Sequence, residues 1–258
     1  MSLRNGVVIV TGASSGIGKM LALELGRQGA NVVLAARGAA ELDALAQEIT
    51  AAGGIALAIP TDVTSDVAVQ ELMRQTLARF GHIDVLINNA GYGVFAPIEE
   101  AEIRHPEGMM NVNYFGGLRC IQAVLPIMRS QKRGHIITIA SVAGLVSTPN
   151  MGAYSASKHA IVAAVQALQM ELHGSPIRCS LICPGPIDTP FFVAADYDKM
   201  SRFAKIFGLL KPAEVVRIIL HVIEHPRTMR VIPRPYHLLV IAYRLFPTLT
   251  KLLLKWVG

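Results

Sequence analysis

The chain has 258 residues, of which 52% are hydrophobic and only 16% are charged, a composition that excludes an intrinsically disordered protein. Its formal net charge is +6, and the whole surplus comes from six basic residues after Glu224, namely Arg227, Arg230, Arg234, Arg244, Lys251 and Lys255. Since the rest of the chain is neutral, the charge excludes a nucleic-acid-binding patch on the body of the protein.

Short apolar runs alternate with helical patterns along the chain. We predict strands in seven runs: Gly6–Val10, Asn31–Ala36, Ile55–Ile59, Asp84–Ile87, His135–Ala140, Ile177–Cys183 and Met229–Ile232. Most of these runs are continuously apolar, which is typical of strands buried on both faces of a parallel sheet. Helical spacing predicts helices over residues 18–29, 39–54, 64–81 and 212–224. The alternation predicts an α/β fold, a Rossmann-like doubly wound parallel sheet of about seven strands with helices on both faces.

We expect residues 1–258 to form a single domain, because no repeat and no linker rich in proline, glycine or serine interrupts them. The mixed segment at about 190–211 breaks the alternation after the sixth strand and is predicted to be a lid over the substrate site. Residues 233–258 are a basic, apolar C-terminal extension, which Pro247 is expected to divide into two helical pieces. No leader peptide and no membrane span are expected.

Three glycines mark the turn between the first strand and the first helix, in VVIVTGASSGIG. Gly12, Gly16 and Gly18 permit a tight turn and let the backbone approach a pyrophosphate, which the helix N-terminus then binds through free N–H groups. The spacing G-x-x-x-G-x-G differs from the common G-x-G-x-x-G fingerprint. The alternative is a glycine turn of an unrelated α/β protein. The presence of three glycines between the first strand and the first helix makes this alternative less favourable.

The end of the second strand predicts which dinucleotide binds. NAD sites carry an acidic residue there to bind the ribose 2′-hydroxyl, whereas NADP sites carry a basic group. Ala36 stands where the acid is expected and Arg37 follows, so a guanidinium can pair with a 2′-phosphate. Ser14 or Ser15 can add a hydroxyl. We therefore predict NADP(H) over NAD(H), and the alternative is that Arg37 is simply solvated.

A tyrosine and a lysine four residues apart, in YSASK, indicate acid–base chemistry. Tyr154 and Lys158 share one face of a helix, and a nearby cation lowers the pKa of a phenol, which is ordinarily about 10. Reduction of a carbonyl by a nicotinamide needs a proton donor beside the oxygen, and the reverse reaction needs a base. Ser141, at the end of the fifth strand, can bond the substrate oxygen. The alternatives are an ordinary amphipathic pair and a strand-end serine.

Six motifs occur in order between residues 3 and 232: TGASSGIG, NNAG, NYFG, Ser141, YSASK and PGPIDT. Together they resemble the short-chain dehydrogenase/reductase family in its single-domain form. The resemblance implies that Lys158 also binds the nicotinamide ribose. It further implies that Asn113, the asparagine that fits N-x-x-G, holds a water that relays protons to the lysine. Together with Arg37, the residues that the resemblance places against the cofactor are Gly12, Ser14, Ser15, Gly16, Ile17, Gly18, Asp62, Val63, Asn89, Ala90, Gly91, Tyr154, Lys158, Pro184, Gly185, Ile187 and Thr189.

The motifs predict an enzyme, an NAD(P)-dependent short-chain dehydrogenase/reductase acting on CH–OH groups. Its catalytic residues are predicted to be Asn113, Ser141, Tyr154 and Lys158. We expect hydride to pass between NADP(H) and a lipophilic secondary alcohol or ketone, because phenylalanines and leucines fill the predicted lid. The alternative is a catalytically idle NADP-binding regulatory protein at a membrane surface, which would not need the serine, tyrosine and lysine.

The expected partners are a small lipophilic substrate and further copies of the chain in a homodimer or homotetramer, with no nucleic acid. Cys120, Cys179 and Cys183 lack paired spacing, which indicates reduced thiols, no metal site and a cytoplasmic location. The C-terminal extension places cations beside apolar residues. It suits either an interfacial helix, which would add peripheral membrane contact, or a helix packed on the substrate pocket or another subunit.

Overall fold

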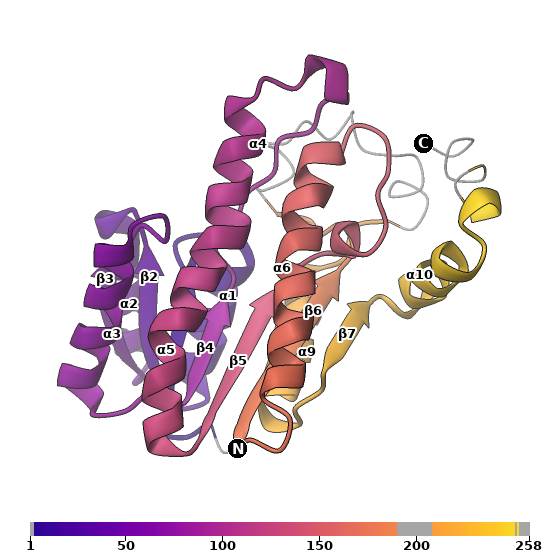
Figure 1. The fold of residues 1–258 in the computed structure, drawn as a ribbon. Helices are drawn as coiled ribbons and strands as arrows, with labels where there is room; N and C mark the ends of the chain where they lie inside the picture. The colour runs from indigo at the N-terminus through magenta and orange to yellow at the C-terminus, as the bar shows by residue number, and fades with distance from the viewer. Residues whose placement is uncertain (1–2, 190–207, 251, 253–258) are drawn as a thin grey trace.

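The computed structural model describes residues 3–189, 208–250 and 252. Parallel strands form a sheet in the order β3–β2–β1–β4–β5–β6–β7 (Figure 1). Their bounds are β1 (Val7–Thr11), β2 (Asn31–Ala36), β3 (Ile55–Pro60), β4 (Val85–Asn88), β5 (Gly134–Ile139), β6 (Ile177–Pro184) and β7 (Met229–Ile232). Each of the seven predicted strands is present within one residue of its predicted bounds, which confirms the Rossmann-like sheet.

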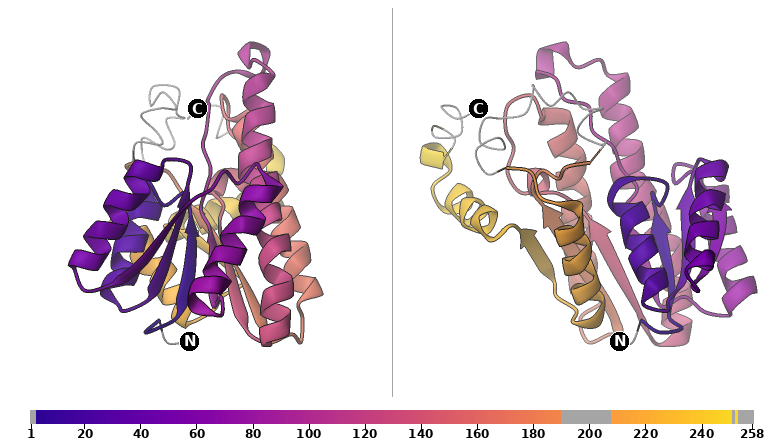
Figure 2. Two further views of the ribbon diagram at one scale, coloured as in Figure 1. Left: turned by 90° about the vertical axis from the view of Figure 1, so that its left-hand side faces the viewer. Right: turned by 180° about the vertical axis from the view of Figure 1, so that it is seen from behind.

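Helices cover both faces of the sheet. Their bounds are α1 (Gly16–Arg27), α2 (Ala39–Ala51), α3 (Asp66–Phe80), α4 (Arg104–Met109), α5 (Gly117–Gln131), α6 (Gly152–Glu171), α9 (Pro212–Glu224) and α10 (Arg234–Leu245), with the short turns η1 (Ile98–Glu100), η2 (Met110–Gly116) and η3 (Val142–Gly144). The four predicted helices correspond to α1, α2, α3 and α9. Figure 1 shows α5 and α6 in front of the sheet, and the view from behind in Figure 2 shows α1 and α9 on the opposite face.

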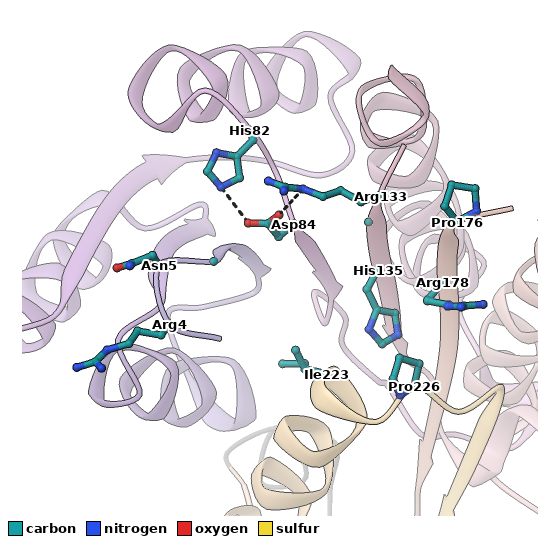
Figure 3. Close-up of a pocket in the computed structure, with 12 residues that line it drawn as sticks. Arg4, Asn5, His82, Asp84, Arg133, His135, Pro176, Arg178, Ile223 and Pro226 are labelled. Atoms are coloured by element: carbon teal, nitrogen blue, oxygen red, sulfur yellow. Dashed lines mark ion pairs between the residues drawn. The ribbon is translucent and has the colours of Figure 1, made fainter. Parts of the chain in front are cut away.

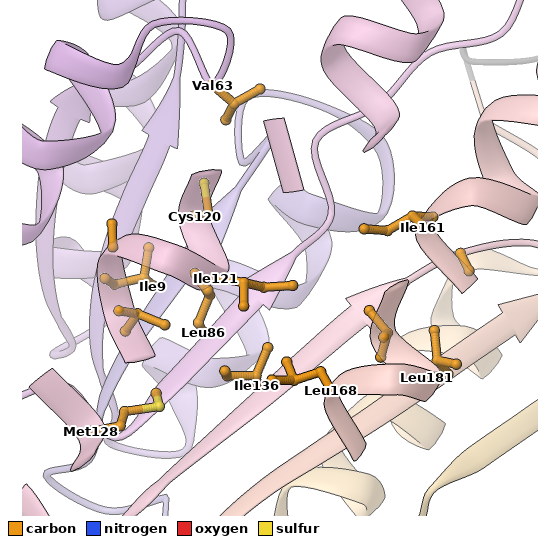
Figure 4. Close-up of a cluster of buried hydrophobic side chains, with 14 of the residues drawn as sticks. Ile9, Val63, Leu86, Cys120, Ile121, Met128, Ile136, Ile161, Leu168 and Leu181 are labelled. Atoms are coloured by element: carbon orange, nitrogen blue, oxygen red, sulfur yellow. The ribbon is translucent and has the colours of Figure 1, made fainter. Parts of the chain in front are cut away.

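Alternate side chains of each central strand enter two different cores. Val7 and Ile9 of β1 belong to the core beneath α3, α5 and α6, part of which Figure 4 shows. Val8 and Val10 belong to the core beneath α1, α2 and α9. Burial on both faces explains why the strands are continuously apolar. The edge strand β3 differs, because Ile55 at its start is 48% exposed.

The order of the strands reverses between β1 and β4, which are hydrogen-bonded neighbours although β2 and β3 lie between them in the chain. In open parallel sheets, ligands bind in the crevice that such a reversal opens at the carboxyl ends of the strands. The chain enters Gly12 at the end of β1 and Asn89 at the end of β4. The reversal therefore brings the TGASSGIG and NNAG motifs side by side.

The segments after β6 extend the sheet at its far edge. Most of the predicted lid, residues 190–207, lies outside the described residues, and its flanks are joined by a bridge between Ile187 and Leu210. After β7, α10 extends away from the sheet (Figures 1 and 2) and ends at Leu245, and residues 247–250 are again helical. The predicted break near Pro247 is present. Among the described residues, no helix is long and apolar enough to cross a membrane.

Candidate active site

The glycine-rich turn lies at the carboxyl end of β1. Gly12 and Gly16 have φ angles of 65° and 53°, in the left-handed region that side chains disfavour. A Cβ on Gly18 would overlap the carbonyl oxygen of Gly12, so only glycine lets α1 begin this close to the turn. Ser15 is the N-cap of α1 but makes no side-chain hydrogen bond to the first turn. The helix N-terminus is uncapped, which fits the phosphates of a dinucleotide.

Thr11 and Asn89 lock this turn against β4. The hydroxyl of Thr11 accepts hydrogen bonds of 3.0 Å from the backbone N–H groups of Asn89 and Ala90, and it donates one of 3.2 Å to the carbonyl of Ile87. The side-chain amide of Asn89 donates to the carbonyl oxygens of Thr11 at 2.9 Å and Gly12 at 3.3 Å. The amide nitrogen of Asn89 is thus committed to holding the turn in shape.

The residues that follow β2 and β3 form one end of the crevice. Ala36 is buried and Arg37 is exposed. Asp62 accepts hydrogen bonds from the backbone N–H and the hydroxyl of Thr64, at 2.9 and 2.8 Å. The bond from the backbone N–H of Thr64 is the main cause that lowers the pKa of Asp62, and the charge of Arg37 acts in the same direction. Arg37 therefore lies near Asp62, and Val63 is buried beside them.

Ser141, Tyr154 and Lys158 lie together at the carboxyl end of β5. Tyr154 and Lys158 are one turn apart on α6, and Nζ of Lys158 is 5.9 Å from the centroid of the Tyr154 ring. Ser141 follows β5 and is hydrogen-bonded to the phenol of Tyr154. Its Oγ also accepts a hydrogen bond of 3.1 Å from the N–H of Ala143. Nζ of Lys158 donates to the carbonyl of Ile139 at 3.2 Å.

Asn113 is held by a network of hydrogen bonds from both of its side-chain atoms. It lies in η2, a π-helical turn between α4 and α5, and such turns are frequent at functional sites. Its Oδ1 accepts from the N–H of Tyr92 at 3.0 Å, and its Nδ2 donates to the carbonyl of Tyr92 at 2.9 Å and to Oγ of Ser157 at 2.9 Å. Ser157 in turn donates to the carbonyl of Tyr154 at 2.8 Å. The network ties Asn113 to the helix that carries Tyr154.

The electrostatics of the Tyr154–Lys158 pair differ from the prediction. Burial raises the pKa of Tyr154 to about 12, and the hydrogen bond with Ser141 opposes that rise only in part. Burial also lowers the pKa of Lys158 to about 8, against an opposing contribution from Cys183. Burial of the phenol therefore outweighs the lowering of its pKa that we expected from the nearby ammonium of Lys158.

The segment after β6 lies between the glycine turn and the cluster of Ser141, Tyr154 and Lys158. The carbonyl of Pro184 lies 3.5 Å from Oγ of Ser141, and the N–H of Gly185 donates to the carbonyl of Ile232 at 2.7 Å. Ile187 is buried. The side chain of Thr189 lies 3.8 Å from the position of a Cβ on Gly16. The residues of the PGPIDT motif are thus brought against the turn.

Gly91 connects the two halves of the site. A Cβ at this position would lie 2.9 Å from Oδ1 of Asn113 and 3.5 Å from Nζ of Lys158. The NNAG motif therefore passes directly beside Lys158. Because Asn89 holds the glycine turn and Gly91 borders the lysine, the turn and the cluster belong to one continuous site.

An apolar cluster surrounds the phenol of Tyr154. Phe95, Met109 and Ala143 are buried with it, and the rings of Phe95 and Tyr154 pack edge to face with their centroids 5.6 Å apart. Leu209, from the end of the predicted lid, packs on the same cluster. The wall beside the reacting position is therefore apolar.

A hollow with a volume of about 490 Å³ lies away from this site, at the amino ends of the strands (Figure 3). Its buried carboxylate, Asp84, pairs with His82 at 3.0 Å and Arg133 at 3.2 Å. Figure 3 shows Arg4 and Arg178 pointing outward from it. Its charged groups therefore pair with one another or face solvent, and they do not converge on one position.

Two residues of the site were not predicted from the sequence. Thr11 begins the TGASSGIG motif, but its bridging role depends on the contact between β1 and β4, which are distant in the chain. Ser157 lies inside YSASK three residues after Tyr154, and a helical serine at this spacing can bond the carbonyl three residues earlier. That spacing could have identified Ser157 from the sequence. Among the described residues, no three histidine, cysteine or acidic side chains come close enough to hold a metal ion.

Comparison with known proteins gives consistent matches. The family model described as short chain dehydrogenase matches residues 6–199. A protein of Staphylococcus saprophyticus named as an uncharacterized oxidoreductase is 38% identical over 223 residues, which cover 83% of this chain and 95% of that protein. An oxidoreductase of Listeria monocytogenes, also named as uncharacterized, is 37% identical over 238 residues, 90% of this chain and 95% of that protein.

Solved structures are similar over most of the chain. A short-chain dehydrogenase/reductase of Burkholderia phymatum, in complex with NAD, has a TM-score of 0.87 at 27% identity and covers 97% of both chains. An alcohol dehydrogenase of the archaeon Thermococcus sibiricus, complexed with 5-hydroxy-NADP, has a TM-score of 0.79 at 29% identity. It matches 88% of this chain and 95% of its own.

Proposed function

This chain belongs to the short-chain dehydrogenase family, and from that membership we propose that it transfers a hydride between NADP(H) and a lipophilic secondary alcohol or ketone. The family makes it an NAD(P)-dependent oxidoreductase. One observation carries the proposed mechanism. The phenol of Tyr154 is hydrogen-bonded to Ser141 at the carboxyl edge of the sheet, in the same site as the glycine turn.

Tyr154 acts as the proton donor to the substrate oxygen. Because burial raises the pKa of Tyr154 to about 12, its phenol is protonated at neutral pH, which is the form that reduction of a carbonyl needs. Ser141 bonds the same oxygen and stabilises the negative charge that develops on it. When bound, the nicotinamide supplies the hydride.

Lys158 and Asn113 support the donor. The ammonium of Lys158 lies over the ring of Tyr154 and beside Gly91, where a cation stabilises negative charge on the phenol after it has given up its proton. The neighbouring amide of Asn113 is fixed by Tyr92 and Ser157. We assign it the anchoring of a water that returns protons towards Lys158.

Arg37 selects NADP(H). It is exposed at the carboxyl end of β2, directly after the buried Ala36, so no acidic side chain occupies the usual place of a ribose 2′-hydroxyl acceptor. Its guanidinium can pair with a 2′-phosphate in two hydrogen bonds. The solved relatives hold NAD in one case and 5-hydroxy-NADP in the other, so the preference of this chain depends on its own residues.

The substrate is lipophilic because the phenol of Tyr154 lies in an apolar wall. Phe95, Met109 and Leu209 form this wall. Burial of apolar substrate surface against this wall would supply most of the binding free energy.

The proposal extends to assembly and location. We propose a homodimer or homotetramer, the usual state of the family. Cys120, Cys179 and Cys183 are free thiols, which suits the reducing conditions of the cytoplasm.

Replacement of Tyr154 by phenylalanine tests the mechanism. We expect kcat for ketone reduction to fall by about 10²–10⁴-fold while the Kd for NADPH changes little, because the phenol acts on the transferred proton. Tyr114→Phe, which alters a phenol on η2 outside the Ser141–Lys158 cluster, is the control and should keep its kcat. Unchanged turnover in Tyr154→Phe would refute the mechanism. Cofactor binding by the wild type without turnover of any lipophilic carbonyl would instead favour the idle regulator.

A further inference from the structure

The outer face of the C-terminal extension carries an unusual concentration of exposed apolar side chains. Of the 13 large hydrophobic residues that are exposed in the described part of the chain, six lie between positions 238 and 252. They are Leu238, Ile241, Leu245, Phe246, Leu249 and Leu252, and we call them the outer apolar row. On the opposite side, Tyr236 and Val240 are buried. The helix is therefore apolar both where it packs on the protein and where it faces outward.

The row continues across the break after α10. The spacing of Leu238, Ile241 and Leu245 by three and four residues places them on one face of α10. Oγ1 of Thr250 then donates to the carbonyls of Phe246 at 2.8 Å and Ala242 at 3.1 Å. This hydroxyl ties the next helical turn to the end of α10. Thr250 is buried while Leu249 and Leu252 are exposed, so the outward face remains apolar.

The charges beside the row have one sign. Arg234 and Arg244 are exposed on α10, and among the described residues neither has a carboxylate within ion-pair distance. The whole chain contains no acidic residue after Glu224, while Lys251 and Lys255 follow in the sequence. A second copy docked on this face by two-fold symmetry would bring these cations towards one another. An anionic lipid bilayer matches both properties of this face, because its acyl region accepts apolar side chains and its headgroups attract cations.

We propose that the outer apolar row and its flanking arginines are a docking surface for an anionic lipid bilayer. α10 would lie in the headgroup region, with leucines entering the acyl boundary and arginines at the phosphates. The inner face of α10, opposite the outer apolar row, adjoins the active site, since the ring of Tyr236 lies 3.1 Å from where a Cβ on Gly185 would stand. Docking would thus place the carboxyl edge of the sheet close to a bilayer, where a lipophilic substrate dissolves.

Cosedimentation of the full chain with vesicles tests the proposal. We expect binding to vesicles of phosphatidylcholine and phosphatidylglycerol (3:1) and much weaker binding to phosphatidylcholine alone. Replacing both Arg234 and Arg244 with glutamine should weaken binding to the anionic vesicles by roughly 25-fold, since each cation near such a surface contributes about fivefold. Raising the salt concentration should have a similar effect.

The apolar contribution is tested by Leu238→Ser with Leu245→Ser, which we expect to lower vesicle affinity by at least about tenfold. The matched control is Val67→Ser with Ile103→Ser, two positions that are 80% and 70% exposed on other elements, and it should bind vesicles like the wild type. All variants should keep NADPH binding, which shows that they are folded. Equal binding of the two serine double variants, or no preference for anionic vesicles, would overturn the proposal. A third outcome would also overturn it: the wild type is a dimer that binds no vesicles, and the Leu238→Ser with Leu245→Ser variant is a monomer.

Discussion

Replacement of Ser157 by alanine should destabilise the protein and slow the reaction, because one hydroxyl joins two parts of the site. Ser157 is completely buried on α6. Its Oγ accepts a hydrogen bond of 2.9 Å from Nδ2 of Asn113 and donates one of 2.8 Å to the carbonyl of Tyr154. The alanine variant loses both bonds and frees Asn113 to change its position in η2.

The magnitude follows from these contacts. Each lost neutral hydrogen bond costs about 0.5–1.5 kcal/mol, and a buried N–H left without an acceptor costs about 1–3 kcal/mol. One of the two N–H bonds of the Asn113 amide keeps its acceptor at Tyr92, so only one N–H is left without a partner. We expect the free energy of unfolding to fall by roughly 2 kcal/mol. Because Asn113 supports proton transfer in the proposed mechanism, kcat should fall more than KM rises.

Ser155→Ala is the matched control for chemical denaturation. Ser155 lies two residues earlier on the same helix and is equally buried, but its Oγ has no hydrogen-bond partner among the described residues. Removing that hydroxyl should leave the free energy of unfolding unchanged or raise it slightly, and it should leave kcat unchanged. If the two alanine variants differed by less than about 0.5 kcal/mol, the bracing role of Ser157 would be refuted.

Three further substitutions test other parts of the site. Arg37→Asp should raise the Kd for NADPH by about 10–100-fold and lower the Kd for NADH, because a partner of the 2′-phosphate is replaced by an acceptor for the 2′-hydroxyl. An unchanged ratio of the two Kd values in a titration of both cofactors would contradict the role of Arg37. Lys158→Met should abolish turnover yet raise the free energy of unfolding at pH 7 by about 3 kcal/mol, because burial lowers the pKa of Lys158 to about 8 from 10.5 and so opposes its charged form. The unfolded wild type binds more protons than the folded one between these pH values, so this difference should shrink as the pH rises from 8 to 10.5, and a constant difference in denaturation curves would argue against it. Gly18→Ala should abolish NADPH binding in a fluorescence titration, because its Cβ would overlap the Gly12 carbonyl, whereas Gly53→Ala, with open space around it, should bind NADPH normally.

Local sequence predicted most of the fold because the burial of a strand determines which residue types it contains. Strands that are covered on both faces must be apolar at every position, and that pattern located the central strands to within one residue. The continuous apolar pattern is less clear where a strand is exposed to solvent. β3 lies at the edge of the sheet and is partly exposed, so continuous burial did not describe it. The π-helical turn η2 depends on tertiary packing and had no local signal.

The sequence by itself determined which chemical groups the site contains, since the motifs around Gly12, Ser141, Tyr154 and Lys158 are short and their spacing suits a turn, a strand end and one helical face. Only the tertiary structure decided how those groups behave. Burial sets the pKa of Tyr154 at about 12, and desolvation depends on residues such as Phe95 that lie far away in the chain. The spacing of Tyr154 and Lys158 indicates that they are neighbours, but it cannot show how much water remains around them, and that water sets the pKa of both groups.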